Sequence, residues 1–130
     1  MTTKLNINTR YAVKVTIRPP LKLLDLVMQG GSLELDEAKK GKDDDEDSVS
    51  YMSEFDTFGY DLTLREKRIE LPISFKFQGG YNMTVALQCK LYKELEVEHC
   101  HWGQALTYLE YDCEIKEGSS HIDVLREKHL

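Results

Sequence analysis

Apolar residues recur at every second position over much of this 130-residue chain, and this period constrains the fold more than any other feature. In the first stretch the alternating residues are Leu5, Ile7, Tyr11, Val13, Val15 and Ile17, with Asn, Arg, Lys and Thr mainly between them. Side chains of a β-strand alternate between two faces, so this pattern predicts a strand with one buried face. Pro19 and Pro20 end the strand, because proline has no N–H to donate to a sheet.

The same period returns in three later segments. Residues 69–77 alternate, and Pro72 on the opposite face predicts an edge strand or a bulge. Gly79-Gly80 is a turn signal, and residues 81–91 then alternate again, which predicts an antiparallel hairpin. Residues 107–115 place four residues on one side of a further strand: Leu109, Tyr111, Cys113 and Ile115.

About seven such strands with short turns predict an all-β fold, an antiparallel β-sandwich or barrel. The length suits a single domain over residues 1–130. Residues 36–50 are charged and almost free of apolar side chains, which predicts a flexible acidic loop. The tail from Ser119 is interpreted as a short helix, because Ser119 or Ser120 suits an N-cap and Ile122 and Leu125 are three apart.

Charge and composition exclude several classes of protein. The net charge of -6 and the pI of about 5.2 argue against a nucleic-acid partner, because phosphate binding requires a basic surface. No apolar run approaches the roughly 18 residues of a transmembrane helix, and the first ten residues lack the apolar segment of a signal peptide. Three cysteines without a signal peptide predict reduced thiols and a cytoplasmic protein, with attachment to a membrane through a partner as an alternative.

The segment EHCHWGQALTYLEYDC, residues 98–113, invites a chemical interpretation. His99 and His101 could share a strand face, but Cys100 would point the other way, and no second ligand cluster completes a zinc site. As a nucleophile Cys100 lacks an identifiable base and orienting acid, and a disulfide with Cys113 is disfavoured in a reducing compartment. A loop followed by a strand is the favoured interpretation, with Trp102 anchored to the core.

Other motifs of catalysis and cofactor binding are also missing from the sequence. The acidic run at residues 43–47 lacks the spacing of a calcium loop, and no phosphate-binding loop, dinucleotide fingerprint or nucleophile elbow occurs. The prediction is therefore a protein that is not an enzyme and that holds no metal or cofactor.

Three segments together resemble one known family. Residues 3–19, 51–59 and above all 98–113 are similar to the cannabinoid receptor-interacting proteins. In the last segment the resembling positions, a structural marker of the family, are His99, Cys100, Trp102, Gly103, Glu110, Tyr111 and Cys113.

The resemblance implies a cytosolic adaptor that is associated with the C-terminal tail of a receptor and with G-protein signalling. It implies a β-sandwich similar in layout to the immunoglobulin-like domain of the Rho GDP-dissociation inhibitors, which hold a lipid chain between their sheets. The resemblance also implies an additional N-terminal segment in the family, to which no part of the present sequence is expected to correspond. Three alternatives remain: a trimmed sandwich, a strand supplied by a partner, or a gene model that starts late.

Three functional hypotheses follow. The first is an adaptor that binds a receptor or G-protein tail peptide at an open sheet edge. The second is a carrier that holds a lipidated peptide between the sheets, and the third is a structural subunit of a larger cytoskeletal or ciliary assembly. The residues predicted to bind the partner or cargo are Val15, Ile17, Phe75, Phe77, Val85, Leu87 and Trp102.

Overall fold

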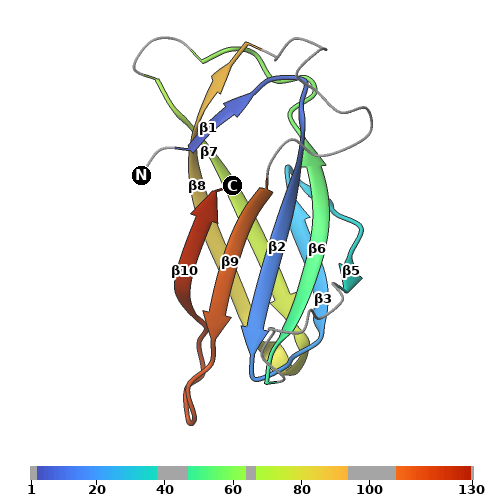
Figure 1. Cartoon of the computed structure of the whole chain (residues 1–130), viewed down its shortest axis with the longest axis vertical. Coiled ribbons are helices and arrows are strands. Elements are labelled where there is room, and N and C mark those ends of the chain that lie inside the picture. The colour runs from blue at the N-terminus through green and yellow to red at the C-terminus, as the bar shows by residue number, and fades with distance from the viewer. Residues whose placement is uncertain (1–2, 38–46, 64–66, 94–107, 130) are drawn as a thin grey trace.

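Two five-stranded β-sheets pack face to face in the computed structural model, which describes residues 3–37, 47–63, 67–93 and 108–129 (Figure 1). The strands are β1 (Thr3–Asn6), β2 (Arg10–Arg18), β3 (Leu23–Met28), β4 (Gly31–Ser32), β5 (Asp36–Glu37), β6 (Val49–Asp56), β7 (Ile69–Phe77), β8 (Asn82–Tyr92), β9 (Tyr108–Glu114) and β10 (Asp123–His129). One sheet has the order β1-β8-β7-β3-β4 and the other β10-β9-β2-β6-β5. The predicted all-β sandwich is confirmed.

Two strand pairings are parallel, although an antiparallel sandwich was expected from the alternation. β1 runs parallel to β8, and β2 runs parallel to β9, whereas the other pairings are antiparallel. A period of two determines which side chains share a face, but it carries no information about the direction of the neighbouring strand.

The first alternating stretch is divided between the two sheets, so the single strand predicted from Leu5 to Ile17 is wrong. The chain leaves β1 in one sheet, turns through Asn8 at a φ of 50°, and enters β2 in the other. Thr57, which is fully buried, holds this crossover. Its Oγ1 accepts a hydrogen bond from the Thr9 N–H at 3.0 Å and donates one to the Asn6 carbonyl at 2.6 Å.

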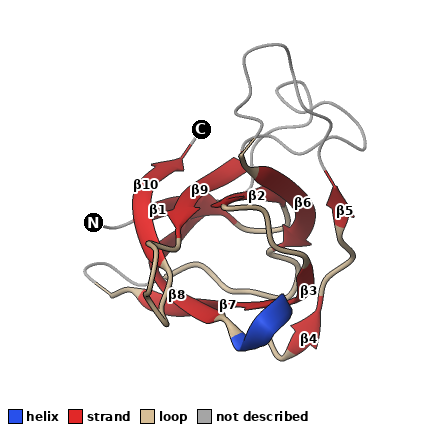
Figure 2. Cartoon of the chain, turned by 90° about the horizontal axis from the view of Figure 1, so that it is seen from below, coloured by secondary structure: helices blue, strands red, loops and turns tan. Residues whose placement is uncertain are grey.

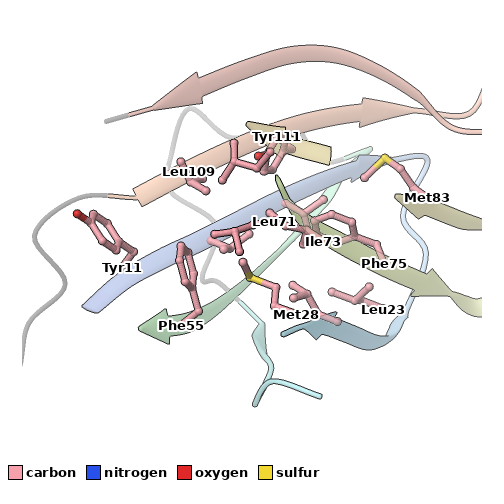
Figure 3. Packing of buried hydrophobic residues seen from close by; sticks show 14 of the residues in the cluster. Tyr11, Leu23, Met28, Phe55, Leu71, Ile73, Phe75, Met83, Leu109 and Tyr111 are labelled. Carbon is pink, nitrogen blue, oxygen red and sulfur yellow. The ribbon is translucent and has the colours of Figure 1, made fainter. Parts of the chain in front are cut away.

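The core lies between the sheets and is built from the alternating residues (Figure 3). The rings of Tyr11 and Phe55 stack with centroids 5.6 Å apart, and those of Phe75 and Tyr111 meet edge to face at 6.1 Å. Aromatic pairs of this geometry contribute about 0.5–1.5 kcal/mol each beyond the burial of their area. The inward faces that the sequence predicts for β2, β7, β8 and β9 are therefore the faces that pack.

The predicted hairpin is formed by β7 and β8, which pair from Ile69 with Cys89 to Lys76 with Asn82. The turn between them contains Gly79 and Gly80 at φ values of 82° and 81°, a conformation that favours glycine. Pro72 causes no bulge, because the register with β8 is continuous through it. The pairing of β3 with β7 stops at Ile73, so β7 is locally an edge strand at Pro72.

The C-terminal segment is a strand, and the short helix predicted there is wrong. β10 pairs antiparallel with β9 along Asp123–His129. So short a helix is marginal without a surface to pack on, whereas β9 offers an edge whose N–H and C=O groups need partners. Tertiary pairing therefore overrides the weak helical spacing of Ile122 and Leu125.

The predicted acidic loop over residues 36–50 contains strand residues at both of its ends. Asp36–Glu37 forms β5, which pairs with Tyr51 and Met52, and β6 begins at Val49. Residues 38–46 lie outside the described residues.

Candidate strand-acceptor edge

β8 is the longest strand, and its outer edge is only partly paired. On one side it pairs with β7, and on the other it pairs with β1 only from Cys89 to Tyr92. Over Asn82–Gln88, which we call the β8 edge, the described residues supply no strand partner. Seven residues of extended chain span about 23 Å, enough to receive a whole additional strand.

The β8 edge lacks the features that usually prevent strands from adding to a sheet. It contains no charged residue, no proline and no bulge. The outer edge of β10, by contrast, has a bulge between Val124 and Arg126 and carries the charged residues Arg126, Glu127 and Lys128. Native proteins protect exposed edges with such bulges and charges. The β8 edge is therefore the better candidate for an edge that a partner strand covers.

β10 extends the other sheet beyond β8, on the same side of the sandwich (Figure 2). The Sγ of Cys113 on β9 contacts the Sδ of Met83 on β8 at 3.7 Å, so β9 lies over β8. On β10, Val124 pairs with Cys113 and Glu127 with Tyr111, which turns both side chains toward the interior. Val124 nevertheless remains 41% exposed, so in the described structure the opposite sheet leaves the inner face of β10 partly uncovered.

Most of the residues predicted to bind a partner or cargo are core residues. Val15, Ile17 and Phe75 have no exposed surface, and Phe77 and Leu87 are almost fully buried. Val85 is partly exposed on the inward side of the β8 edge, and it is the member of this set that lies at the candidate site. Trp102 lies outside the described residues.

The family-marker positions in the described residues lie on β9. Tyr111 and Cys113 are buried, whereas Glu110 faces outward, where its Oε1 is 3.6 Å from Lys14 Nζ on β2. These contacts give the three residues packing and strand-pairing roles. His99, Cys100, Trp102 and Gly103 lie outside the described residues.

The two described thiols are poorly suited to chemistry. Cys89 and Cys113 are free and buried, and burial raises the pKa of Cys89 to about 11 and that of Cys113 to about 12. A thiol is nucleophilic as the thiolate, so these pKa values disfavour reaction near neutral pH. Within the described ranges no group of three His, Cys, Asp or Glu residues is arranged to hold a metal ion. No helix within the same ranges has the length and apolarity that crossing a bilayer requires.

Two open hollows lie elsewhere on the described part of the molecule. One, of about 650 Å³, runs beside β6, and its lining includes Arg10 and the acidic residues Glu34, Asp36, Glu37, Glu54 and Asp56. The other, of about 460 Å³, is lined by residues that include Tyr60, Leu62, Leu71 and Leu91. None of the predicted cargo residues lines either hollow.

The sequence predicted an open sheet edge but indicated neither that it lies on β8 nor that a strand at residues 123–129 lies in the opposite sheet. A usable signal was present, because residues 78–89 contain no charged side chain in a protein whose residues are 31% charged. Val124 and Glu127 could not have been found in this way, since the tail was interpreted as a helix.

Comparisons with known proteins agree with the resemblance in the sequence. The family model described as CB1 cannabinoid receptor-interacting protein 1 matches residues 1–129. The CB1 cannabinoid receptor-interacting protein 1 of Homo sapiens is 31% identical over 129 residues, which cover 99% of this chain and 78% of the human protein. The Mus musculus protein matches with the same identity and coverage, and the Bos taurus protein is 30% identical over 132 residues, again 99% of this chain and 78% of its relative. The chain therefore belongs to the family of CB1 cannabinoid receptor-interacting protein 1.

Proposed function

We propose that this chain is a non-enzymatic adaptor that binds an extended tail segment of a membrane receptor or of a G-protein subunit as an added strand at the β8 edge. The observation that carries the proposal is the run from Asn82 to Gln88, which is uncharged and regular and pairs with β7 on one side. On its other side the described residues supply no strand partner. Strand addition uses main-chain hydrogen bonds for affinity and alternate side chains for specificity. Because such a partner belongs to a membrane protein or lies at a membrane, we place the adaptor on the cytoplasmic side, attached through that partner.

The names of the relatives support a receptor as the partner. They are called CB1 cannabinoid receptor-interacting proteins, and we extend to this chain the interaction with a receptor of that kind. The finer choice between a receptor tail and a G-protein segment is left to binding experiments.

The proposal is tested by titrating the isotopically labelled chain with a synthetic C-terminal tail peptide of a cannabinoid receptor and, separately, with terminal peptides of a G-protein α-subunit. We expect the backbone amide signals of Asn82–Gln88 to shift, and the alternate amides whose N–H points away from β7 to become protected from hydrogen exchange. Shifts that scatter away from every strand edge, with no change at β8, would refute strand addition at this site.

Two matched substitutions sharpen the test. Val85→Glu places a charge on the inward side of the β8 edge, whereas Ala86→Glu places the same charge on its exposed outward side. We expect Val85→Glu to weaken peptide binding at least about tenfold, or 1.4 kcal/mol, and Ala86→Glu to change it much less. Val124→Glu is a second variant for the case that Val85→Glu unfolds, because Val124 is exposed, and Leu24→Glu, 57% exposed on β3, is its control.

The two remaining hypotheses give different results in the same experiments. A lipid carrier predicts that a myristoylated peptide binds far more tightly than the bare peptide, since each buried CH₂ contributes about 0.8 kcal/mol. A fixed subunit of a larger assembly predicts that the isolated chain is poorly soluble or poorly folded. Val15, Ile17, Phe75, Phe77 and Leu87 are buried in the core and line neither of the two hollows given above, so we base the proposal on the edge.

A further inference from the structure

We infer that the strand accepted at the β8 edge runs parallel to β8, in line with β1. Three of its side chains point inward, beside Met83, Val85 and Leu87 of β8. The first and third of these side chains are apolar, and the second is basic. This inference rests on the proposed function, because it describes the occupant of the same edge. It specifies the direction and the side-chain chemistry of that occupant, which the proposed function leaves open.

The direction follows from β1. β1 already lies on the outer side of β8, parallel to it, and pairs Thr3 with Cys89 and Leu5 with Leu91. An occupant that continues β1 backward along β8 extends one evenly spaced hydrogen-bond pattern, whereas an antiparallel occupant would require the pattern to change at Cys89. The parallel strand therefore ends, at its C-terminus, against the start of β1.

The apolar side chains follow from the two surfaces that meet at the edge. On β8, Met83, Val85 and Leu87 point inward, and Val85 is the most exposed of the three. On the opposite sheet, Val124 of β10 pairs with the inward-facing Cys113, and its side chain is 41% exposed. Inward side chains of an added strand would lie between these two surfaces and remove both from water, which favours aliphatic residues.

The basic side chain follows from Glu127. Glu127 pairs with Tyr111 of β9, so its carboxylate is on the inward face of β10. Val124 pairs with Cys113, two residues further along β9. The Glu127 charge acts on a buried group: burial raises the pKa of the Tyr111 hydroxyl, and the negative charge of Glu127 raises it further. A strand inserted beneath β10 brings its central inward side chain toward this carboxylate, and a lysine or arginine there complements the charge.

The experiment uses the full chain and a seven-residue peptide of the sequence Thr-Val-Thr-Lys-Thr-Val-Thr. A nitroxide label is attached to the N-terminus of the peptide in one sample and to its C-terminus in another. With parallel binding we expect the N-terminal label to broaden amide signals near Asn82, and the C-terminal label to broaden those near Gln88 and Thr3. The opposite distribution, or no binding of this peptide, overturns the inference.

The charge is tested by exchanging it on both sides. Replacing the peptide lysine with glutamate should weaken binding to the native chain by about fivefold, the scale of an exposed ion pair, and Glu127→Lys should reverse this preference. Glu117→Lys, at an exposed turn residue, makes the same change in net charge and should leave the preference unchanged. A preference that Glu127→Lys does not alter overturns the inference.

Failure of the inference can be distinguished from failure of the proposed function. If receptor or G-protein peptides protect the amides of Asn82–Gln88 but show antiparallel broadening or no charge preference, the proposed function stands and the inference falls. If those amides become protected with rising protein concentration and without any peptide, a second copy of the chain occupies the edge, and both fall.

Discussion

At the scale of single residues, Thr57 shows how a buried polar group can hold a change of sheet. Its hydroxyl bonds to both sides of the turn between β1 and β2, accepting from Thr9 and donating to Asn6. The Thr57 N–H also donates to the Thr9 carbonyl at 3.0 Å. The crossover therefore depends on polar contacts that the apolar alternation does not reveal.

Replacing Thr57 by valine preserves the shape of the side chain but removes the hydroxyl. We expect the free energy of unfolding to fall by about 1–3 kcal/mol, because the Thr9 N–H and the Asn6 carbonyl lose a partner in a buried site. Thr84→Val is a control, since Thr84 Oγ1 makes an exposed contact of 3.3 Å with Ser74, and its loss should cost less than about 0.5 kcal/mol. Urea unfolding measures both, and equal losses would contradict this role of Thr57.

The buried thiols should make the fold sensitive to alkali. Burial raises the pKa of Cys89 to about 11 and that of Cys113 to about 12, whereas in the unfolded chain both ionise near the ordinary value of 9.0. The stabilisation is therefore complete below pH 9 and is lost as the pH rises toward the folded-state values. At pH 10 the ionisation of each thiol in the unfolded chain should lower the free energy of unfolding by about 1.4 kcal/mol relative to neutral pH.

Denaturant unfolding measured from pH 8 to pH 10.5 checks this expectation. Tyr111 and Tyr11 add to the loss in the same direction, because burial raises the pKa of their hydroxyls too. In the Cys89→Ala, Cys113→Ala double variant the decline with pH should be shallower, whatever the variant costs in packing at pH 8. An unchanged slope would show that the thiols do not contribute.

At the scale of elements, the bulge in β10 distinguishes the two exposed edges. Leu125 is the residue that the register omits, since Val124 pairs with Cys113 and Arg126 with Asp112. Deleting Leu125 would leave those two pairings consecutive and make the strand regular. We therefore expect the pairing of β10 with β9 to survive the deletion, while the shape of the outer edge changes.

We expect the Leu125 deletion to fold and to associate with itself more strongly than the native chain, because a regular edge is a better template for strand pairing. Sedimentation velocity at matched concentrations measures the association, and circular dichroism verifies the fold. The native chain at each concentration serves as the reference. Identical sedimentation of the two proteins would contradict the protective role of the bulge.

The elements also show where sequence reasoning succeeds. β7 was predicted with the bounds that the structure gives it, because nine residues alternate between a charged connection and a Gly-Gly turn. β10 was missed because its inward positions include Glu127 and its regularity is broken at Leu125, so no period of two remains to be seen. Its strand conformation depends on the edge of β9, a partner that a local pattern does not contain.

At the scale of the whole molecule, the sandwich was predictable and the arrangement of its strands was not. Alternation determined the inward sets of β2, β7, β8 and β9, and these sets form the core. The order of strands and the parallel pairs are decided by packing between segments distant in sequence. The candidate site depends on that order, since among the described residues β1 pairs with β8 only at Cys89–Tyr92. The resemblance in layout to the Rho GDP-dissociation inhibitors stays a prediction.

The parallel pairings of β1 and β2 also determine when the protein can fold during its synthesis. Thr3 pairs with Cys89 and Ala12 with Tyr108, so β1 and β2 have no neighbour in β8 or β9 until those later strands have been made. Contacts between such distant residues form slowly, and unpaired strands are prone to aggregation while they wait. β2, with Val13, Val15 and Ile17 on one face, is the most apolar of these early strands. We therefore expect β2 to be prone to aggregation in the nascent chain until its two neighbours, β6 and β9, have been made.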